Sequence, residues 1–204
     1  TRSAYETLLL DSGNALEGDG LKTVKLMGAA TYDAAAIGTE DAALGIERLQ
    51  ELSAIADFPL LCANWLRQDG ELLFDPYAIF EVDGVRIGVM NLIGRCEMDS
   101  NFDNPFTVAD RLLRHLDADL CLVDFHAEAT SEKGAMAYYL DGRVQALWGT
   151  HTHVPTADCQ VLDRGLGFVT DLGMTGPARS VLGMKHEQAV NRFLGGLPMR
   201  FEPA

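Results

Sequence analysis

The stretch Leu120-Cys-Leu-Val-Asp-Phe125 decides the fold, because a short, mostly apolar run of this kind is typical of a strand. A helical pattern follows near residues 131–140, and a second strand run, Val144-Gln-Ala-Leu-Trp148, comes after it. A strand, a helix and a strand in this order are the repeating unit of α/β domains. The sequence therefore predicts an α/β fold around these two strands.

The first third of the chain repeats this alternation. Strand runs are predicted at residues 7–11, 33–37 and 58–63, and apolar residues with helical spacing separate them at 21–30 and 46–55. Strands that alternate with helices in this way favour a parallel sheet with right-handed crossovers.

The middle of the chain predicts a hairpin. Two strand runs, at 77–82 and 85–92, flank Asp83-Gly84, a dipeptide that is typical of a two-residue hairpin turn. Residues 159–162 and 168–170 indicate a second hairpin. These strands lie antiparallel within each hairpin, so the complete sheet is expected to be mixed.

No repeat, low-complexity tract or linker interrupts the chain. Thr107 is a predicted N-cap for a helix at residues 108–115. We expect residues 1–204 to form a single α/β domain, a mixed sheet flanked by helices, with a first part at 1–64 and a second part at 77–204.

The charge balance argues against one class of function. The 204 residues, 48% of them apolar, suffice for a sizeable core, and the formal net charge is −14 with a pI near 4.6. Such an acidic balance argues against a nucleic-acid groove built on bulk positive charge. A small anionic substrate, such as a nucleotide, stays compatible with it, because a bound divalent metal can reverse the local field.

The sequence gives no sign of a membrane or secretion segment. No apolar run approaches the roughly 20 residues that span a bilayer, and residues 1–6 lack a basic stretch followed by an apolar one. The four cysteines have no CxxC spacing and are expected to be reduced thiols. We therefore expect a cytoplasmic protein with no membrane partner.

Three histidines follow two of the predicted strands. His126 comes directly after the first of these strands, and His151 and His153 follow the second. Sites of open α/β sheets gather at such strand ends, and an extended backbone would put His151 and His153 on the same side. Lone histidines such as His115 and His186 are more often ordinary surface residues. Three at neighbouring strand ends predict a metal site, because neutral imidazole binds Zn, Mn or Fe.

Four motifs around these histidines resemble one family, the small bacterial calcineurin-like metallophosphoesterases that hydrolyse phosphodiesters such as 2′,3′-cyclic nucleotides. The motifs are Phe125-His-Ala-Glu-Ala-Thr-Ser-Glu-Lys133, Tyr139-Leu-Asp-Gly-Arg-Val144, Gly149-Thr-His-Thr-His-Val154 and Thr170-Asp-Leu-Gly-Met-Thr-Gly-Pro177. The resemblance runs with little interruption from Cys121 to Glu202, and it extends back as far as Phe80. It implies a fold of the calcineurin-like type and a metal-dependent hydrolase.

The resemblance also implies a pair of divalent metal ions, Mn, Fe or Zn, with His126 and His151 on one and His153 on the other. Two such ions lower the pKa of a bridging water and clamp the phosphoryl oxygens for in-line attack. Carboxylates in such sites orient the ligating imidazoles. Four further residues are therefore expected to support the histidines: Asp124, Glu128, Thr150 and Thr152.

The first third of the chain resembles the 5′-nucleotidase branch instead, and it departs from the family at two motifs. In Ser12-Gly-Asn-Ala-Leu-Glu-Gly18, Asn14 stands where that branch has an Asp that bridges the metals. In Ile37-Gly-Thr-Glu-Asp41, the metal-binding Asn and catalytic His of a Gly-Asn-His motif are replaced. The family's first Asp motif is not found before Thr7.

Two residues of this region stay candidates for the site. Asn14 can coordinate a metal through its amide oxygen, and Glu40, with Asp41 beside it, can replace a lost ligand or act as the catalytic acid. The structural alternatives carry equal weight. Asn14 can cap the following turn, and Glu40 can be a favourable charge at a helix N-terminus.

The expected function is metal-dependent hydrolysis of a small phosphate ester, phosphodiesters above monoesters, with weakened activity because two motifs are absent. One rival is a non-catalytic, degenerate or engineered relative that keeps the fold and a histidine metal site. A 5′-nucleotidase-type monoesterase, supported by the first third alone, ranks last. The sequence does not decide whether the chain forms a homo-oligomer or binds a partner chain that supplies the missing strand.

Overall fold

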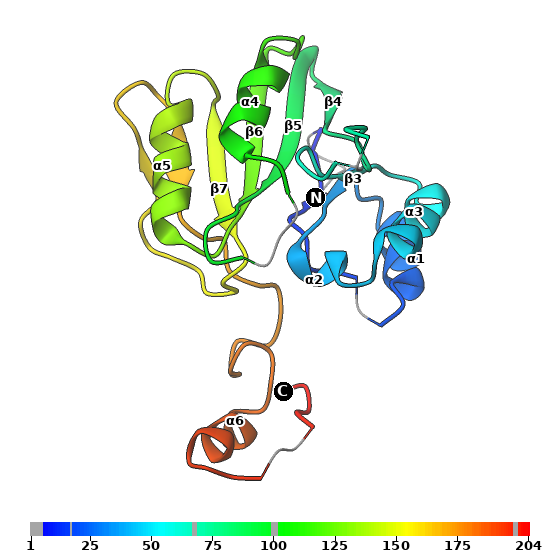
Figure 1. Ribbon diagram of the computed structural model, residues 1–204, viewed down its shortest axis with the longest axis vertical. Coiled ribbons are helices and arrows are strands. Elements are labelled where there is room, and N and C mark those ends of the chain that lie inside the picture. The colour runs from blue at the N-terminus through cyan, green and yellow to red at the C-terminus, as the bar shows by residue number, and fades with distance from the viewer. Residues whose placement is uncertain (1–5, 17, 67–68, 99–101, 198–199) are drawn as a thin grey trace.

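The strands form two sheets in the computed structural model, which describes residues 6–16, 18–66, 69–98, 102–197 and 200–204 (Figure 1). The smaller sheet is parallel, in the order β1 (Leu10–Asp11), β2 (Ala34–Ala36) and β3 (Leu60–Leu61). The predicted parallel arrangement of the first third is thus confirmed. The strands β1 and β3 are shorter than the predicted runs 7–11 and 58–63.

The larger sheet has the order β4-β5-β6-β7-β9-β8. Its strands are β4 (Tyr77–Val82), β5 (Val85–Ile93), β6 (Leu120–His126), β7 (Ala146–Thr150), β8 (Gln160–Val161) and β9 (Gly167–Val169). The four central strands are parallel, and β4 and β8 pair antiparallel at the two edges. Both predicted hairpins form, the first with positive φ angles at Asp83 and Gly84. The predicted mixed α/β fold is confirmed, but the strands form two sheets where one was expected.

The two sheets pack face to face, and helices cover their outer faces (Figure 1). Alternate side chains of each strand point to opposite faces. Ala34 and Leu61 of the smaller sheet therefore meet Val89 of the larger sheet, while Met90 packs among the helices on the other side. The result is four layers, with helices outside and the two sheets inside.

Four helices form the outer layers. They are α1 (Leu21–Ala29) and α3 (Ile46–Ile55) on the smaller sheet, and α4 (Pro105–Leu113) and α5 (Thr130–Leu140) on the larger one. Each turns an apolar stripe inward, as helical spacing predicts for α1 and α3. In the described part of the chain, no helix is long and apolar enough to cross a bilayer.

The predicted start of α4 is wrong. The helix begins at Pro105, and Asn104, not Thr107, is its N-cap. The side chain of Asn104 accepts a hydrogen bond of 3.0 Å from the backbone N–H of Phe106. Proline suits the first helical position because its missing N–H would have no partner there. The short helix α2 (Thr39–Ala42) and the C-terminal helix α6 (His186–Phe193) were not predicted.

Candidate metal centre

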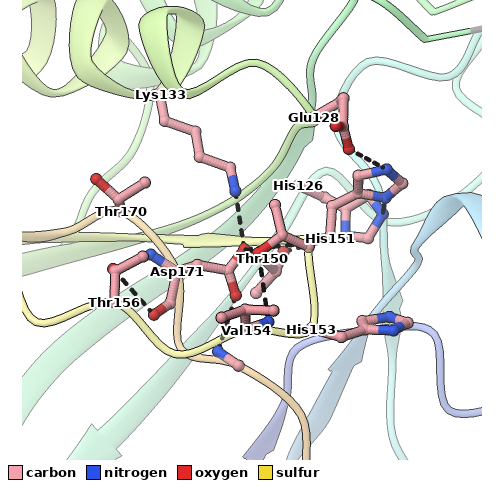
Figure 2. Close-up of polar contacts among 12 residues, drawn as sticks. His126, Glu128, Lys133, Thr150, His151, His153, Val154, Thr156, Thr170 and Asp171 are labelled. Carbon is pink, nitrogen blue, oxygen red and sulfur yellow. Dashed lines mark hydrogen bonds and ion pairs between the residues drawn. The ribbon is translucent and has the colours of Figure 1, made fainter. Parts of the chain in front are cut away.

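Two imidazoles and one threonine meet where β2, β6 and β7 end. His126 is the last residue of β6, His151 follows β7, and Thr39 follows β2 in the other sheet. The Nε2 of His126 lies 3.1 Å from the Nδ1 of His151. The Oγ1 of Thr39 lies 3.2 Å from the first and 3.3 Å from the second of these nitrogens. Figure 2 shows the two rings side by side.

The hydrogen bonds of His126 assign its tautomer. The backbone N–H of Thr39 can only donate, and it points at Nε2 of His126 over 3.2 Å, so Nε2 carries a lone pair. The other ring nitrogen lies 3.0 Å from the hydroxyl of Thr150, which donates to Asp124 over 3.1 Å. Burial, together with the nearby His151, lowers the pKa of His126 to about 3. His126 is therefore a neutral donor with its lone pair facing the centre.

His151 is oriented by Glu128 in the same manner. Its Nε2 lies 3.0 Å from the carboxylate of Glu128, which an imidazole N–H would satisfy. The Nδ1 that faces His126 then also carries a lone pair. Two lone pairs 3.1 Å apart repel each other unless a proton or a cation lies between them. The centre is thus arranged to hold positive charge.

His153 does not join this pair. The expectation of an extended backbone with His151 and His153 on the same side is wrong, because their φ angles are +104° and +64°. The chain turns at this point, and Nε2 of His153 lies 3.4 Å from the amide Nδ2 of Asn14. In Figure 2 the ring of His153 lies apart from the other two.

A buried ion pair supports the turn that contains His151 and His153. Lys133 of α5 and Asp171 are almost fully buried, with Nζ 2.8 Å from the carboxylate (Figure 2). The same carboxylate oxygen accepts from the backbone N–H and the hydroxyl of Thr152 over 3.1 and 2.8 Å. Although burial raises it, the pKa of Asp171 is lowered overall, because Lys133 and these donors stabilise the anion. Thr152 therefore supports the turn through Asp171, without touching a histidine ring in these contacts.

The space for the ion pair depends on Gly149. A Cβ at this position would overlap the carbonyl oxygen of Thr170 and lie 2.8 Å from Cδ of Lys133. Sequence reasoning overlooked Lys133 and Asp171. The helical spacing of α5 indicates a buried Lys133, because this residue lies on the same stripe as Met136, Ala137 and Leu140. A lysine in such a stripe needs a buried acidic partner.

The N-terminal candidates are arranged around Asn14. Its Oδ1 accepts from the backbone N–H of Glu40 over 3.0 Å, and a Cβ on Gly38 would overlap this oxygen. Glu40 itself is exposed at the start of α2. Asp41 is buried and accepts from the N–H groups of Asn14 and Gly38 and of one further residue, Leu16. Burial raises the pKa of Asp41. Asp41 thus holds the loops after β1 and β2 together through backbone N–H groups.

A small cavity between the sheets lies behind the centre. Asn91, Asp11 and Trp148 line it together with Asp124. The amide of Asn91 and the Oδ2 of Asp124 have no hydrogen-bond partner within the described ranges. Burial raises the pKa of Asp124 to about 7. The remaining oxygen of Asp124 accepts from Thr150, the contact that orients His126.

Three donor atoms lie close enough together to share one divalent ion. Among the described residues, no group of three or more His, Cys, Asp or Glu side chains could hold a metal ion. The pair His126 and His151 with the Thr39 hydroxyl spans 3.1–3.3 Å. Donors about 2.1 Å from a shared ion have about this separation. Within the described residues, no carboxylate contacts the two ring nitrogens that face each other, because Glu128 contacts the outer nitrogen of His151. Two neighbouring dications would need carboxylates between them.

Comparison with known proteins assigns the family. The family model described as YmdB-like protein matches residues 62–204. This chain belongs to the YmdB-like family. A 2′,3′-cyclic-nucleotide 2′-phosphodiesterase of Bacillus subtilis is 45% identical over 126 residues, which cover 61% of this chain and 47% of that protein. The matched region thus spans about half the length of this curated relative.

Solved structures of two bacterial proteins resemble this YmdB-like chain. One is described as a novel phosphatase from Mycoplasma pneumoniae, with a TM-score of 0.79, 31% identity, and coverage of 100% of this chain and 74% of that one. The other is a hypothetical protein from Thermus thermophilus, with a TM-score of 0.76, 37% identity, and coverage of 90% and 70%.

More distant structures share the fold of the YmdB-like chain. A calcineurin-like phosphoesterase from Bacillus subtilis has a TM-score of 0.63 and 17% identity, with coverage of 84% of this chain and 70% of that one. A 5′-nucleotidase precursor from Thermus thermophilus has a TM-score of 0.63 and 21% identity, with coverage of 84% and 41%. The resemblance inferred from the motifs is confirmed, because a 2′,3′-cyclic-nucleotide phosphodiesterase is among the relatives, and calcineurin-like phosphoesterases and 5′-nucleotidases are among the structures that share the fold.

Proposed function

We propose that this chain is a phosphoesterase that hydrolyses small phosphodiesters slowly, with one divalent ion held by His126, His151 and the Thr39 hydroxyl. The observation that carries the proposal is the pair of ring nitrogens 3.1 Å apart, each with its other nitrogen next to a hydrogen-bonding group. The related Bacillus phosphodiesterase supports the choice of diesters.

The chain's own residues prepare the site for such a substrate. When bound, the ion would supply Lewis acidity toward a phosphoryl oxygen and a water of lowered pKa. Asp124 and Thr150 keep the His126 lone pair aimed at the centre, and Glu128 does the same for His151. Lys133 pairs with Asp171, which binds Thr152 in the turn between His151 and His153. No step draws on Glu40, whose exposed carboxylate would repel a phosphate.

One observation supports a rival function, a relative that binds a metal without turnover: among the described residues, no carboxylate contacts the two facing ring nitrogens. The two functions share the metal site and differ in hydrolysis. Metal binding therefore tests the site, and turnover distinguishes the two functions.

Replacing His126 by Ala is expected to weaken binding of Mn²⁺ or Zn²⁺ at least about tenfold, since one of three donors is lost. Isothermal titration of metal-free protein measures this. His115→Ala is the matched control, because His115 is exposed and lies just beyond the end of α4. Equal affinities of the unchanged protein and His126→Ala would contradict the assignment.

We also expect at most one tightly held ion per chain. Asn14 stands beside His153 without a negative charge, and dications held close together repel each other. Elemental analysis of protein purified without chelator gives the number directly. Asn14→Asp should raise it, because a carboxylate next to His153 offers a second ion a charged ligand. Two tight ions in the unchanged chain would show that the donor set is larger than described.

A further inference from the structure

The C-terminal arm, which the structure describes at residues 174–197 and 200–204, exposes an unusual share of apolar surface. It leaves the two sheets at the edge where the candidate centre lies, and α6 stands well away from them (Figure 1). On α6 and just after it, Phe193, Leu194 and Leu197 are 87%, 80% and 85% exposed. Of the twenty exposed large apolar side chains in the described residues, nine lie in this arm. Soluble monomers rarely gather apolar surface in this way.

The arm is internally ordered, which distinguishes it from a loose tail. Lys185 forms an ion pair of 2.6 Å with Glu202, and their backbones join through a hydrogen bond of 3.0 Å. Gln188 accepts from the backbone N–H of Glu202 over 2.7 Å. None of the three core clusters of the described chain includes an arm residue, and Ala189, which is buried within the arm itself, belongs to none of them. The arm therefore holds its shape without covering its apolar side chains.

The charge of the arm is opposite to that of the rest of the chain. It holds four of the sixteen Lys and Arg residues and two of the thirty Asp and Glu residues. The arm is thus formally positive, on a body that carries the entire negative excess. The cations are Arg179, Lys185, Arg192 and Arg200. Complementary potentials of this kind steer association and fix its register.

We propose that the arm docks against the body of a second copy of this chain. Each copy offers a basic, apolar arm and an acidic body, so two copies can exchange arms about a two-fold axis and form the contact twice. A stable interface buries about 800 Å² per partner, and the arm offers nine exposed large apolar side chains toward such a contact. The proposal does not depend on the phosphoesterase function.

A membrane surface fits the arm less well. The anionic lipids that attract a basic helix repel a body of strongly negative charge. The apolar side chains also extend beyond the eight residues of α6, to Leu182 and Phe201, so they do not form one helical face. A second copy offers an acidic surface to the arm without this repulsion.

The test is sedimentation velocity of the full chain over a wide range of protein concentration. The unchanged protein is expected to associate, and Phe193→Glu with Leu197→Glu to weaken association at least about tenfold. Leu26→Glu on α1 is the control, because Leu26 is 59% exposed on the body. Arg192→Glu should also weaken association, and salt should do so in the unchanged protein. Circular dichroism checks that each variant keeps its fold.

Three results would overturn the proposal. The first is an unchanged protein that stays monomeric at every concentration. The second is a Phe193→Glu, Leu197→Glu variant that associates as well as the unchanged protein. The third is co-sedimentation with phosphatidylserine vesicles, abolished by Phe193→Glu, in a protein that does not self-associate, which would assign the arm to a membrane surface.

Discussion

Lys133→Met is expected to destabilise the protein by about 3–5 kcal/mol, since it leaves the buried Asp171 without its cation. The methionine keeps most of the volume of the lysine stem, so the loss comes from the charge and not from a cavity. Urea denaturation at neutral pH measures it. Lys22→Met on the exposed side of α1 is the matched control and should stay within about 0.5 kcal/mol of the unchanged protein.

Replacing Asp171, the partner of Lys133, tests whether the loss of stability comes from the unpaired charge. Adding Asp171→Asn to Lys133→Met should restore much of the stability, because the uncompensated charge is gone. In the unchanged protein the pKa of Asp171 lies below its ordinary 3.8. Its contribution to stability is therefore complete above about pH 4 and is lost as the pH falls through the folded-state pKa. The single variant should behave oppositely, with a deficit that shrinks as acid neutralises Asp171. A deficit that is independent of pH would contradict this account.

Replacing Thr39 by Asn and Glu40 by His is expected to raise hydrolysis of bis-p-nitrophenyl phosphate by about 10²–10⁴-fold. Glu40 is exposed and its contact with Asn14 is made by its backbone N–H, so its carboxyl group is not held at the centre as an acid. The double replacement supplies an amide oxygen to the metal and an imidazole that can protonate the leaving oxygen. Rates are measured with added Mn²⁺ for both proteins.

The control for this gain is a third protein with His151→Ala added to the double replacement. It should return to the background rate, because the gain requires the metal donors. Robust turnover by the unchanged chain, abolished by His151→Ala, would show that the site has been rebuilt with other groups. No turnover in either protein, with metal binding intact, would favour the non-catalytic relative.

Local signals predicted much of the fold. The spacing of apolar residues placed α3 at residues 46–55 and α1 within one residue of its end, since each helix buries one stripe. Asp83-Gly84 located the first hairpin because both of its residues accept positive φ angles. The division of the strands into two sheets depends on contacts such as Ala34 with Val89, which are distant in sequence and leave no local pattern.

The site was predictable in its ligand types and less so in its geometry. Histidines at strand ends are visible in the sequence, and the meeting of His126 with His151 follows from the pairing of β6 with β7. The turn at His151, with its φ of +104°, was not visible, since the next residue, Thr152, is bound by Asp171 from another part of the chain. Thr39 was read as a replaced ligand, and its contact with both rings requires the second sheet.

The candidate centre is shared between the two sheets. Thr39 reaches it from the smaller sheet, and His126 and His151 reach it from the larger one. Such a centre exists only while the sheets are docked, so any ligand bound there draws its affinity partly from the docking equilibrium. A change that loosens the sheet interface, such as Val89→Ala far from the rings, would then weaken binding at temperatures where each sheet is still folded. On heating, ligand binding would thus be lost when the two sheets separate, at a lower temperature than the unfolding of either sheet.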